Sequence, residues 1–596
     1  MRATLRALAL FGAASLACAA PSFGTPGPHA VPTFNSIGVY WAPAGGSESN
    51  GATLAFREVG KATWRQGLAP WFDPRNAEYR GSVVELEPGT AYEIRLSLES
   101  GSAQTLRSAT WDESFRIKKT VQIAPGTTRL VIDASDSGDE THGYVVFTAP
   151  PGRGAIDQSG IPGDDPRHSC VVVKQGVHHV IIRGLVLRNC KSYGVYIERQ
   201  SKPVLDAQTH DIVIEDNEIA GWGAFERSKP GSGLADDDGA IHCNYYHERD
   251  DAKRPDRIII QRNTLRDPRH GANPWRTGAQ RRHPHGPQGV LFNHCGRNHV
   301  IRYNEIFSTN GNRFNDGIGG FDNFSLAGFP AADSDIHGNS ISDVYDDAIQ
   351  AEGANRNVRI WGNYFDRVFV AIANAATAVG PLYVWRNVSH RMAGMHQPDA
   401  HPDAEGRGPF IKAGSNHPLA VGGRAYYFHN TVLQPPGARY SMGAGWGITN
   451  SGGKLYNFVS RNNIWHIHKE AQISGEPKFG SLKADGSLGP IDADFDVRNG
   501  RLVNIGQHAE RRGWGPGAAG VPIYATSGKS YPDLMAAPGN FTLSRSSPGY
   551  AAAEAIPNFN DRYPRPDVGA HQSGTPPMQF GHKRKGPARL TMEPAT

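Results

Sequence analysis

Hydrophobic residues in the middle of the chain form short runs, each closed by an asparagine in the same local frame, as in Ile259-Ile260-Gln261-Arg262-Asn263. The members of this column are Asn217, Asn263, Asn304, Asn339, Asn363, Asn387, Asn430 and one of Asn462 and Asn463, with Gly184 in the same place of an earlier repeat. Their spacing falls from 46 residues (217 to 263) to 24 (339 to 363). A period of about two dozen residues is typical of one coil of a parallel β-helix. The pattern therefore predicts an all-β fold, a right-handed parallel β-helix over residues 124–475, with the asparagines stacked at one turn.

A second column combines a small residue with an aliphatic one. Its members are Gly194-Val195, Ala240-Ile241, Gly289-Val290, Gly317-Ile318, Ala348-Ile349 and Ala371-Ile372. The aliphatic residue should point into the coil, and alternation along the strand should turn the next residue outward. Insertions near 221–238, 267–287 and 390–408 lengthen some repeats. We expect them to form walls beside this strand face, where functional residues tend to gather.

The regions on either side of the repeats have other patterns. Residues 32–123 contain short alternating stretches separated by turn signals, such as Pro88-Gly89-Thr90 before Tyr92–Leu96, which predicts a small β-sandwich. The run from Leu86 to Tyr92 resembles the Leu-x-Pro-Gly-Thr-x-Tyr motif of fibronectin type III domains. Residues 476–596 lose the repeat and are rich in proline, so we expect a cap on the coil and a loose tail.

Residues 1–20 are typical of a secretory signal peptide, because Arg2 and Arg6 precede an apolar run that ends in Ala17-Cys18-Ala19. No later apolar stretch is long enough for a membrane helix, so we expect a secreted or periplasmic protein with no membrane partner. A net charge of +5 over 596 residues is nearly neutral, and predicts no nucleic-acid partner. The cysteines Cys170, Cys190, Cys243 and Cys295 form no C-x-x-C pair, which disfavours a zinc site built on cysteine. We expect them to be mostly buried thiols.

Acidic residues gather where the small residues of the second column begin. Asp238 precedes Gly239, Asp316 precedes Gly317, and Asp346-Asp347 precede Ala348. Carboxylates on neighbouring coils would lie roughly 5–10 Å apart, a range that covers both geometries of glycoside cleavage. Strict alternation would turn Asp347 inward, so we expect Asp316 and Asp347 to lie at loop–strand junctions, before the pleat begins. The alternative is that these aspartates only cap turns.

Polar residues farther along the same strands should face outward. The predicted catalytic residues are Asp316, Asp346, Asp347, Glu352 and Lys412. The residues predicted to bind substrate are Asp238, His242, Asn244, Asn293 and Gln350.

Two of these motifs resemble those of polygalacturonase-type glycosidases. Asn315-Asp316-Gly317 resembles their Asn-Thr-Asp-Gly segment, shorter by one residue, and Asp346-Asp347-Ala348-Ile349 resembles their Asp-Asp-Cys-Val segment. The resemblance implies that Asp316, Asp346 and Asp347 supply the acid and activate water. Phe410 replaces the arginine of the family's Arg-Ile-Lys element, and no Gly-His-Gly follows Asp347. We expect a monomeric hydrolase that acts on a polysaccharide and needs no cofactor.

Two other interpretations stay open. In a polysaccharide lyase, Asp346, Asp347 and Glu352 could bind Ca²⁺, and Lys412 could be the base if its pKa were lowered. In a glycan-binding β-helix without catalysis, the acidic column would only be solvated. His283 and His285 lie on the 267–287 insertion as either metal ligands or plain surface histidines.

Overall fold

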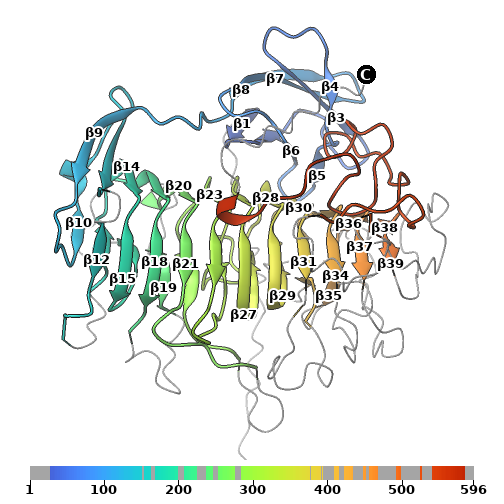
Figure 1. Cartoon of the computed structure of the whole chain (residues 1–596). Helices are drawn as coiled ribbons and strands as arrows, with labels where there is room; N and C mark the ends of the chain where they lie inside the picture. The colour runs from blue at the N-terminus through green and yellow to red at the C-terminus, as the bar shows by residue number, and fades with distance from the viewer. Residues whose placement is uncertain are drawn as a thin grey trace, which may run out of the picture.

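The computed structural model describes residues 27–150, 154–162, 168–198, 207–224, 237–245, 253–275, 283–375, 377–390, 392, 408–414, 422–433, 448–450, 456–466, 492–498, 524–525 and 540–583. The predicted signal peptide lies outside these residues. The protein is all-β: a small sandwich lies across one side of a long parallel β-helix (Figure 1). In the described part of the chain, no helix has the length and apolar character needed to cross a membrane.

The sandwich consists of two antiparallel four-stranded sheets. One contains β1 (His29–Pro32), β2 (Ile37–Trp41), β6 (Glu78–Val83) and β5 (Trp71–Asp73), and the other β4 (Arg65–Gln66), β3 (Ala52–Glu58), β7 (Ala91–Leu98) and β8 (Ala103–Ala109). Alternating residues of facing strands, such as Val39, Leu54 and Ile94, are buried together between the sheets. The prediction of a small β-sandwich ahead of the β-helix is confirmed.

The coils of the β-helix build three strand faces. Face 1 is a twelve-stranded parallel sheet of β9 (Ile117–Gln122), β11 (Tyr144–Thr148), β14 (His178–Arg183), β17 (His210–Glu215), β20 (Asp256–Gln261), β23 (Val300–Arg302), β26 (Asp335–His337), β28 (Val358–Trp361), β30 (Leu382–Trp385), β33 (Ala425–Phe428), β36 (Phe458–Arg461) and β38 (Asp492–Asp494). Its first strand, β9, falls within the range predicted for the sandwich, and its last, β38, lies beyond the predicted end of the β-helix.

Faces 2 and 3 share a nineteen-stranded sheet. Face 2 contains β12 (Ala155–Asp157), β15 (Val186–Cys190), β18 (Glu218–Trp222), β21 (Thr264–Arg266), β24 (Glu305–Phe307), β31 (Val388–His390), β34 (Thr431–Leu433), β37 (Ile464–His466) and β39 (Val497–Arg498). Face 3 contains β10 (Leu130–Ile132), β13 (Val171–Val173), β16 (Val195–Glu198), β19 (Gly239–Asn244), β22 (Gln288–Asn293), β25 (Ile318–Gly319), β32 (Ile411–Ala413) and β35 (Ile448–Asn450). Two long strands, β27 (Ser340–Gln350) and β29 (Tyr364–Ala373), pass from face 2 into face 3.

The runs of branched aliphatics on face 1 are explained by burial on both sides of its strands. Ile258 and Ile260 of β20 belong to the interior of the coil, whereas Ile259 between them packs outward against a cluster that includes Phe34. Strands covered on both sides are typically continuous apolar runs rather than alternating ones. The sandwich and its connection thus stabilise face 1 from outside.

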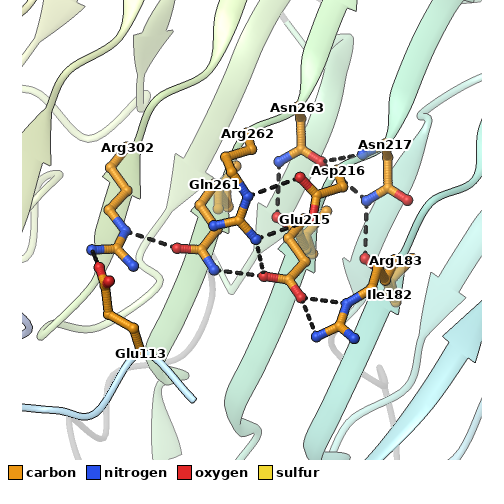
Figure 2. A network of polar contacts seen from close by, with 12 residues as sticks. Glu113, Ile182, Arg183, Glu215, Asp216, Asn217, Gln261, Arg262, Asn263 and Arg302 are labelled. Carbon is orange, nitrogen blue, oxygen red and sulfur yellow. Dashed lines mark hydrogen bonds and ion pairs between the residues drawn. The ribbon is translucent and has the colours of Figure 1, made fainter. Parts of the chain in front are cut away.

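The predicted stack of asparagines forms at the corner between faces 1 and 2. Asn339 is typical: its main-chain N–H and its Nδ2 both donate to Asn363 Oδ1, at 3.0 Å each, and Nδ2 also donates to the carbonyl oxygen of Ile301. The same contacts connect Asn217, Asn263, Asn304, Asn339, Asn363, Asn387, Asn430 and Asn463, and the stack ends on Asp496. We call this row the asparagine ladder. Figure 2 shows its Asn217–Asn263 step beside ionic contacts on face 1.

The ladder shows that one residue, Gly184, was assigned to the wrong position in the repeat. Gly184 is not the equivalent of the ladder asparagines, because Leu185 pairs with Asn217 through a hydrogen bond from its N–H to Oδ1. Gly184 instead corresponds to Asp216, the residue before the asparagine, and both have positive φ (68° and 56°). The left-handed conformation that makes the turn is therefore taken by the residue before the ladder asparagine.

The expectation of buried thiols is wrong. Cys170 pairs with Cys190, and Cys243 with Cys295, as two disulfides inside the coil. All four side chains belong to the interior cluster of the β-helix. Sequence spacing could not predict this pairing, because the partners meet only when the coils stack.

The C-terminal segment runs back along the asparagine corner rather than only closing the last coil. Glu554 N–H donates to Asn462 Oδ1, and Gly581 N–H donates to the carbonyl of Gly338 several coils earlier. The described part of the segment ends in a short 3-10 turn, η8 (Gly581–Lys583), and another, η1 (Ala134–Asp136), lies near the start of the β-helix. The segment also contacts the sandwich, since Asn558 and Val84 exchange two hydrogen bonds of 2.8 Å.

Candidate active site

Three aspartates from two adjacent coils meet where face 2 turns into face 3. Asp316 precedes β25, Asp346 and Asp347 lie in β27, and the two strands pair through Ile318 and Ile349. One carboxylate oxygen of each aspartate lies within 4.8 Å of the others, and all three side chains are buried. Asp316 and Asp347 thus occupy equivalent points on adjacent coils, and the prediction that carboxylates of neighbouring coils come close together is confirmed.

The backbone fixes the relative position of these groups. Asp347 N–H donates to Asp316 Oδ1 at 3.0 Å, and Gly317 N–H donates to the carbonyl of Asp347 at the same distance. A Cβ at Gly317 would lie 2.5 Å from the carbonyl oxygen of Ala348 on the next coil. The small-residue column therefore exists because neighbouring coils approach too closely here for a larger side chain.

The corner between faces 2 and 3 turns Asp347 outward. The two residues that follow it, Ala348 and Ile349, both belong to the interior of the coil, so side chains do not alternate strictly at this corner. Before the corner, Val344 pairs with Val368 and Asp347 with Val370, so β27 also has a bulge, one residue more than β29 between these pairs. The expectation of a loop–strand junction is correct for Asp316 but wrong for Asp347, which lies inside a continuous strand.

Lys412 and Glu352 complete the predicted catalytic group. Lys412 Nζ lies 2.6 Å from Asp347 Oδ2 and 3.3 Å from Glu352 Oε1. Lys412 pairs with Ala373, which in turn pairs with Gln350, so the lysine reaches across a whole coil. The small side chain of Ala373 leaves that path open.

Burial and mutual repulsion dominate the electrostatics of the cluster. Burial and the charges of Asp346 and Asp347 raise the pKa of Asp316 well above its usual range. Burial and Asp346 also raise the pKa of Asp347, against the opposing charge of Lys412. For Lys412, burial lowers the pKa, but the charges of Asp347 and Glu352 outweigh it and hold the pKa well above its usual value.

Two residues that were not predicted as site residues border this cluster from the 267–287 insertion. His283 Nε2 lies 2.9 Å from Asp346 Oδ2, and this contact raises the pKa of His283 to about 9 although burial opposes its charge. Trp275 packs against His283, with ring centroids 4.5 Å apart, and against Phe369 of β29. The His-Pro-His motif marked His283 as a possible metal ligand. No sequence pattern predicted that the insertion would place this histidine beside Asp346.

Some buried oxygens of the cluster have no hydrogen bond. Among the described residues, no hydrogen-bond donor reaches Asp346 Oδ1 or Asp347 Oδ1. A buried acceptor without a donor costs free energy, so such atoms mark a place for water or a ligand. The all-oxygen set of Asp316, Asp346 and Asp347 could also hold a hard divalent cation.

Two of the residues predicted to bind substrate have structural partners. Asp238 is fully buried, and its Oδ2 accepts hydrogen bonds from His270 Nε2 at 2.7 Å and from Ala224 N–H at 3.1 Å. His242 is equally buried and lies 4.5 Å, between ring centroids, from Tyr193. Neither side chain is exposed to a ligand in this structure.

The other three are distributed along face 3. Asn244 and Asn293 pair in register on adjacent coils, and Asn293 Oδ1 accepts a hydrogen bond from Phe321 N–H. Gln350 lies next to the acidic cluster, and its Oε1 faces Gly320 N–H at 3.4 Å. Of the predicted substrate-binding residues, Gln350 alone shares a strand with Asp346 and Asp347.

Comparison with known proteins adds no family to this description. No protein-family model matches the chain, and no curated protein matches it at a significant level.

Proposed function

We propose that the protein hydrolyses glycosidic bonds in a polysaccharide, with Asp316, Asp346 and Asp347 as the acid–base machinery. The observation that carries the proposal is the convergence of these three buried carboxylates, with oxygens within 4.8 Å of one another, from two coils. Glycoside cleavage needs one protonated and one ionised carboxyl group across the same bond. Two carboxyl groups whose surroundings separate their pKa values meet this need.

The charges of the neighbours suggest which group keeps the proton. Among the described residues, four carboxylates, those of Asp316, Asp346, Asp347 and Glu352, face two cations, Lys412 and His283. Asp316 forms no ion pair with a described residue, so a proton retained by the cluster is most stable there. We assign Asp316 as the general acid, and Asp346 and Asp347 as the carboxylates that activate water.

Trp275 supports a sugar substrate. Its indole, partly exposed, lies beside His283 and hence beside Asp346. Binding sites commonly combine an apolar or aromatic surface with a few convergent polar groups, and the apolar face of a pyranose ring fits such a surface.

Calcium-dependent elimination is the second candidate, and two observations count against its proposed residues. A base must be neutral, yet Asp347 and Glu352 hold Lys412 in its charged form. The same ammonium group lies against two of the three carboxylates that would bind Ca²⁺. Hydrolysis is therefore the function that the geometry supports best.

The test compares uronate-containing and neutral polysaccharides as substrates for the wild-type protein and for Asp347→Asn and Lys412→Ala. Hydrolysis predicts new reducing ends without ultraviolet absorbance, loss of turnover in Asp347→Asn, and little effect of EDTA. Elimination predicts an absorbing unsaturated product, inactivation by EDTA and a nearly inactive Lys412→Ala. Full activity of both variants would show that this site is not the catalytic one. A glycan-binding protein without catalysis would bind the polysaccharide and release neither new reducing ends nor an unsaturated product.

The two disulfides support export as part of this proposal, because disulfides persist in oxidising compartments. A secreted or periplasmic location also fits a polymer substrate. Monomeric state and independence of a cofactor remain predictions.

A further inference from the structure

A second cluster of titratable side chains lies on face 1, where two neighbouring strands begin. β14 begins with His178-His179 and β17 with His210-Asp211, and His178 pairs in register with His210. The second residue of each pair has positive φ, 51° at His179 and 53° at Asp211. This turn of the backbone brings both side chains of each pair to the same outer surface, where their rings and carboxylate contact one another.

The potential ligand atoms are close together. His178 Nδ1 lies 3.2 Å from His179 Nδ1, and His210 Nδ1 lies 2.7 Å from Asp211 Oδ2. The rings of His178 and His210 stack with centroids 5.0 Å apart. One ligand atom each of His179, His210 and Asp211 lies within 4.8 Å of the others. Tetrahedral zinc, with bonds of about 2.0–2.1 Å, places its ligand atoms roughly 3.3 Å apart.

We propose that His178, His179, His210 and Asp211 form a binding site for a divalent transition metal ion of the zinc class. The ligand atoms are the three Nδ1 atoms and Asp211 Oδ2. Each imidazole binds as a neutral ring with its proton on Nε2, so the ion replaces the hydrogen bond between His210 and Asp211. Nitrogen-rich sites of this kind favour zinc and its neighbours over Ca²⁺ or Mg²⁺.

The surroundings orient the carboxylate for this role. Tyr144 Oη donates to Asp211 Oδ1 at 3.2 Å, and the Arg257 guanidinium lies 3.0 Å from the same oxygen, so Oδ2 is the oxygen turned toward the histidines. Hydrogen bonds behind a metal ligand fix its orientation and strengthen binding. His179 and Asp211 are buried, whereas His178 and His210 are partly exposed and leave an entry path from solvent.

Because the ligands come from two strands, the ion would connect adjacent coils near the start of the β-helix. This cluster is on face 1, whereas the three aspartates of the candidate active site lie between faces 2 and 3. The proposal therefore does not depend on the proposed hydrolysis, and its test needs no substrate.

The test titrates Zn²⁺ into the chelator-treated full-length protein by calorimetry. We expect one saturable site. Its affinity for zinc should fall about 100-fold or more in His178→Ala and in His210→Ala, and about 10-fold in Tyr144→Phe. His178 is partly exposed, so His178→Ala tests the site with little risk to folding. Co²⁺ in place of Zn²⁺ should give the intense visible absorption of tetrahedral cobalt, and zinc should raise the Tm of the wild type but not of the histidine variants.

Two variants serve as controls. His29→Ala removes a histidine of the sandwich, and Asp346→Asn alters the other cluster of described residues that could bind a cation; both should leave the zinc titration unchanged. The proposal is overturned if the wild type shows no saturable zinc binding, or if binding persists undiminished in His178→Ala and His210→Ala. Loss of zinc binding in Asp346→Asn alone would also overturn it, since the ion would then belong to the aspartates.

Discussion

Two corners of the β-helix stack polar side chains from coil to coil, and they do so with opposite results. In the asparagine ladder, each side chain is both donor and acceptor, so Asn339 finds partners above and below it. In the acidic corner, Asp316, Asp346 and Asp347 are all acceptors when ionised, and stacking brings like charges together. Burial is nearly complete at both corners.

The difference separates structure from function within one architecture. A buried polar network with every group paired adds stability and fixes the register of neighbouring coils. A buried network that lacks partners costs stability and persists where it serves another purpose.

Replacing Asp316 should affect catalysis most strongly. Asp316→Asn should lower kcat by about 1,000-fold, because the amide cannot transfer a proton. Because the pKa of Asp316 is raised in the folded protein, the folded state keeps a proton that the unfolded chain releases, and stability falls as the pH rises above the unfolded pKa near 4. The variant should therefore be more stable than the wild type at pH 7, by roughly 1–2 kcal/mol. Denaturant unfolding at pH 5 and pH 7 measures this gain, and a less stable variant would contradict the contrast.

Replacing an asparagine of the ladder should lower the stability of the fold. Asn339→Ala removes both Nδ2 donors and the acceptor used by Asn304, so the free energy of unfolding should fall by about 3 kcal/mol. Activity measured well below the melting temperature should be unchanged. Asn310→Ala, at an exposed turn, is the matched control and should cost less than about 1 kcal/mol. Equal losses in the two variants would mean that the ladder carries no special stability.

A smaller effect is expected at Trp275. Trp275→Ala should raise KM about 10-fold with little change in kcat, if the ring binds substrate equally in the ground and transition states. Steady-state kinetics on a soluble polymer measure both constants. Trp275→Phe should recover most of the loss, and a change in kcat alone would mean that the ring positions His283 instead.

The smallest effect is a shift in pH dependence. Because Asp346 raises the pKa of His283 to about 9, the ion pair is fully formed below pH 6.5 and disappears as the pH rises through about 9. Activity that depends on this charge should decline over the same interval. In His283→Gln, the pH–rate profile should lose that alkaline limb. A limb that stays in place would assign it to another group, such as Lys412.

Much of the fold was predictable from sequence because its signals repeat. Asn363 and Asn387 are one coil and 24 residues apart, as are Asn339 and Asn363, and the same local frame recurs in the repeats that insertions lengthen. The pairing of Asp316 with Asp347 followed from the same register, without knowledge of the bulge. Residues that repeat in one frame lie in one place on the coil, so periodicity alone locates them.

What could not be predicted depends on single, non-repeating events. The extra residue of β27 between Val344 and Asp347 has no sequence signature, yet it changes the register of β27 against β29. The approach of His283 to Asp346 depends on the path of an insertion. The bonding of Cys243 to Cys295 likewise depends on which coils become neighbours.

The contact of Asn558 with Val84 has a consequence for folding. Coils of a solenoid ordinarily interact only with their nearest neighbours, so such proteins fold locally and can fray from either end. Here two hydrogen bonds join residues 474 positions apart. This contact of extreme sequence separation cannot form until the intervening coils have stacked, which delays the last step of folding. Once formed, it makes the ends of the chain depend on each other, so the molecule should unfold as a single cooperative unit.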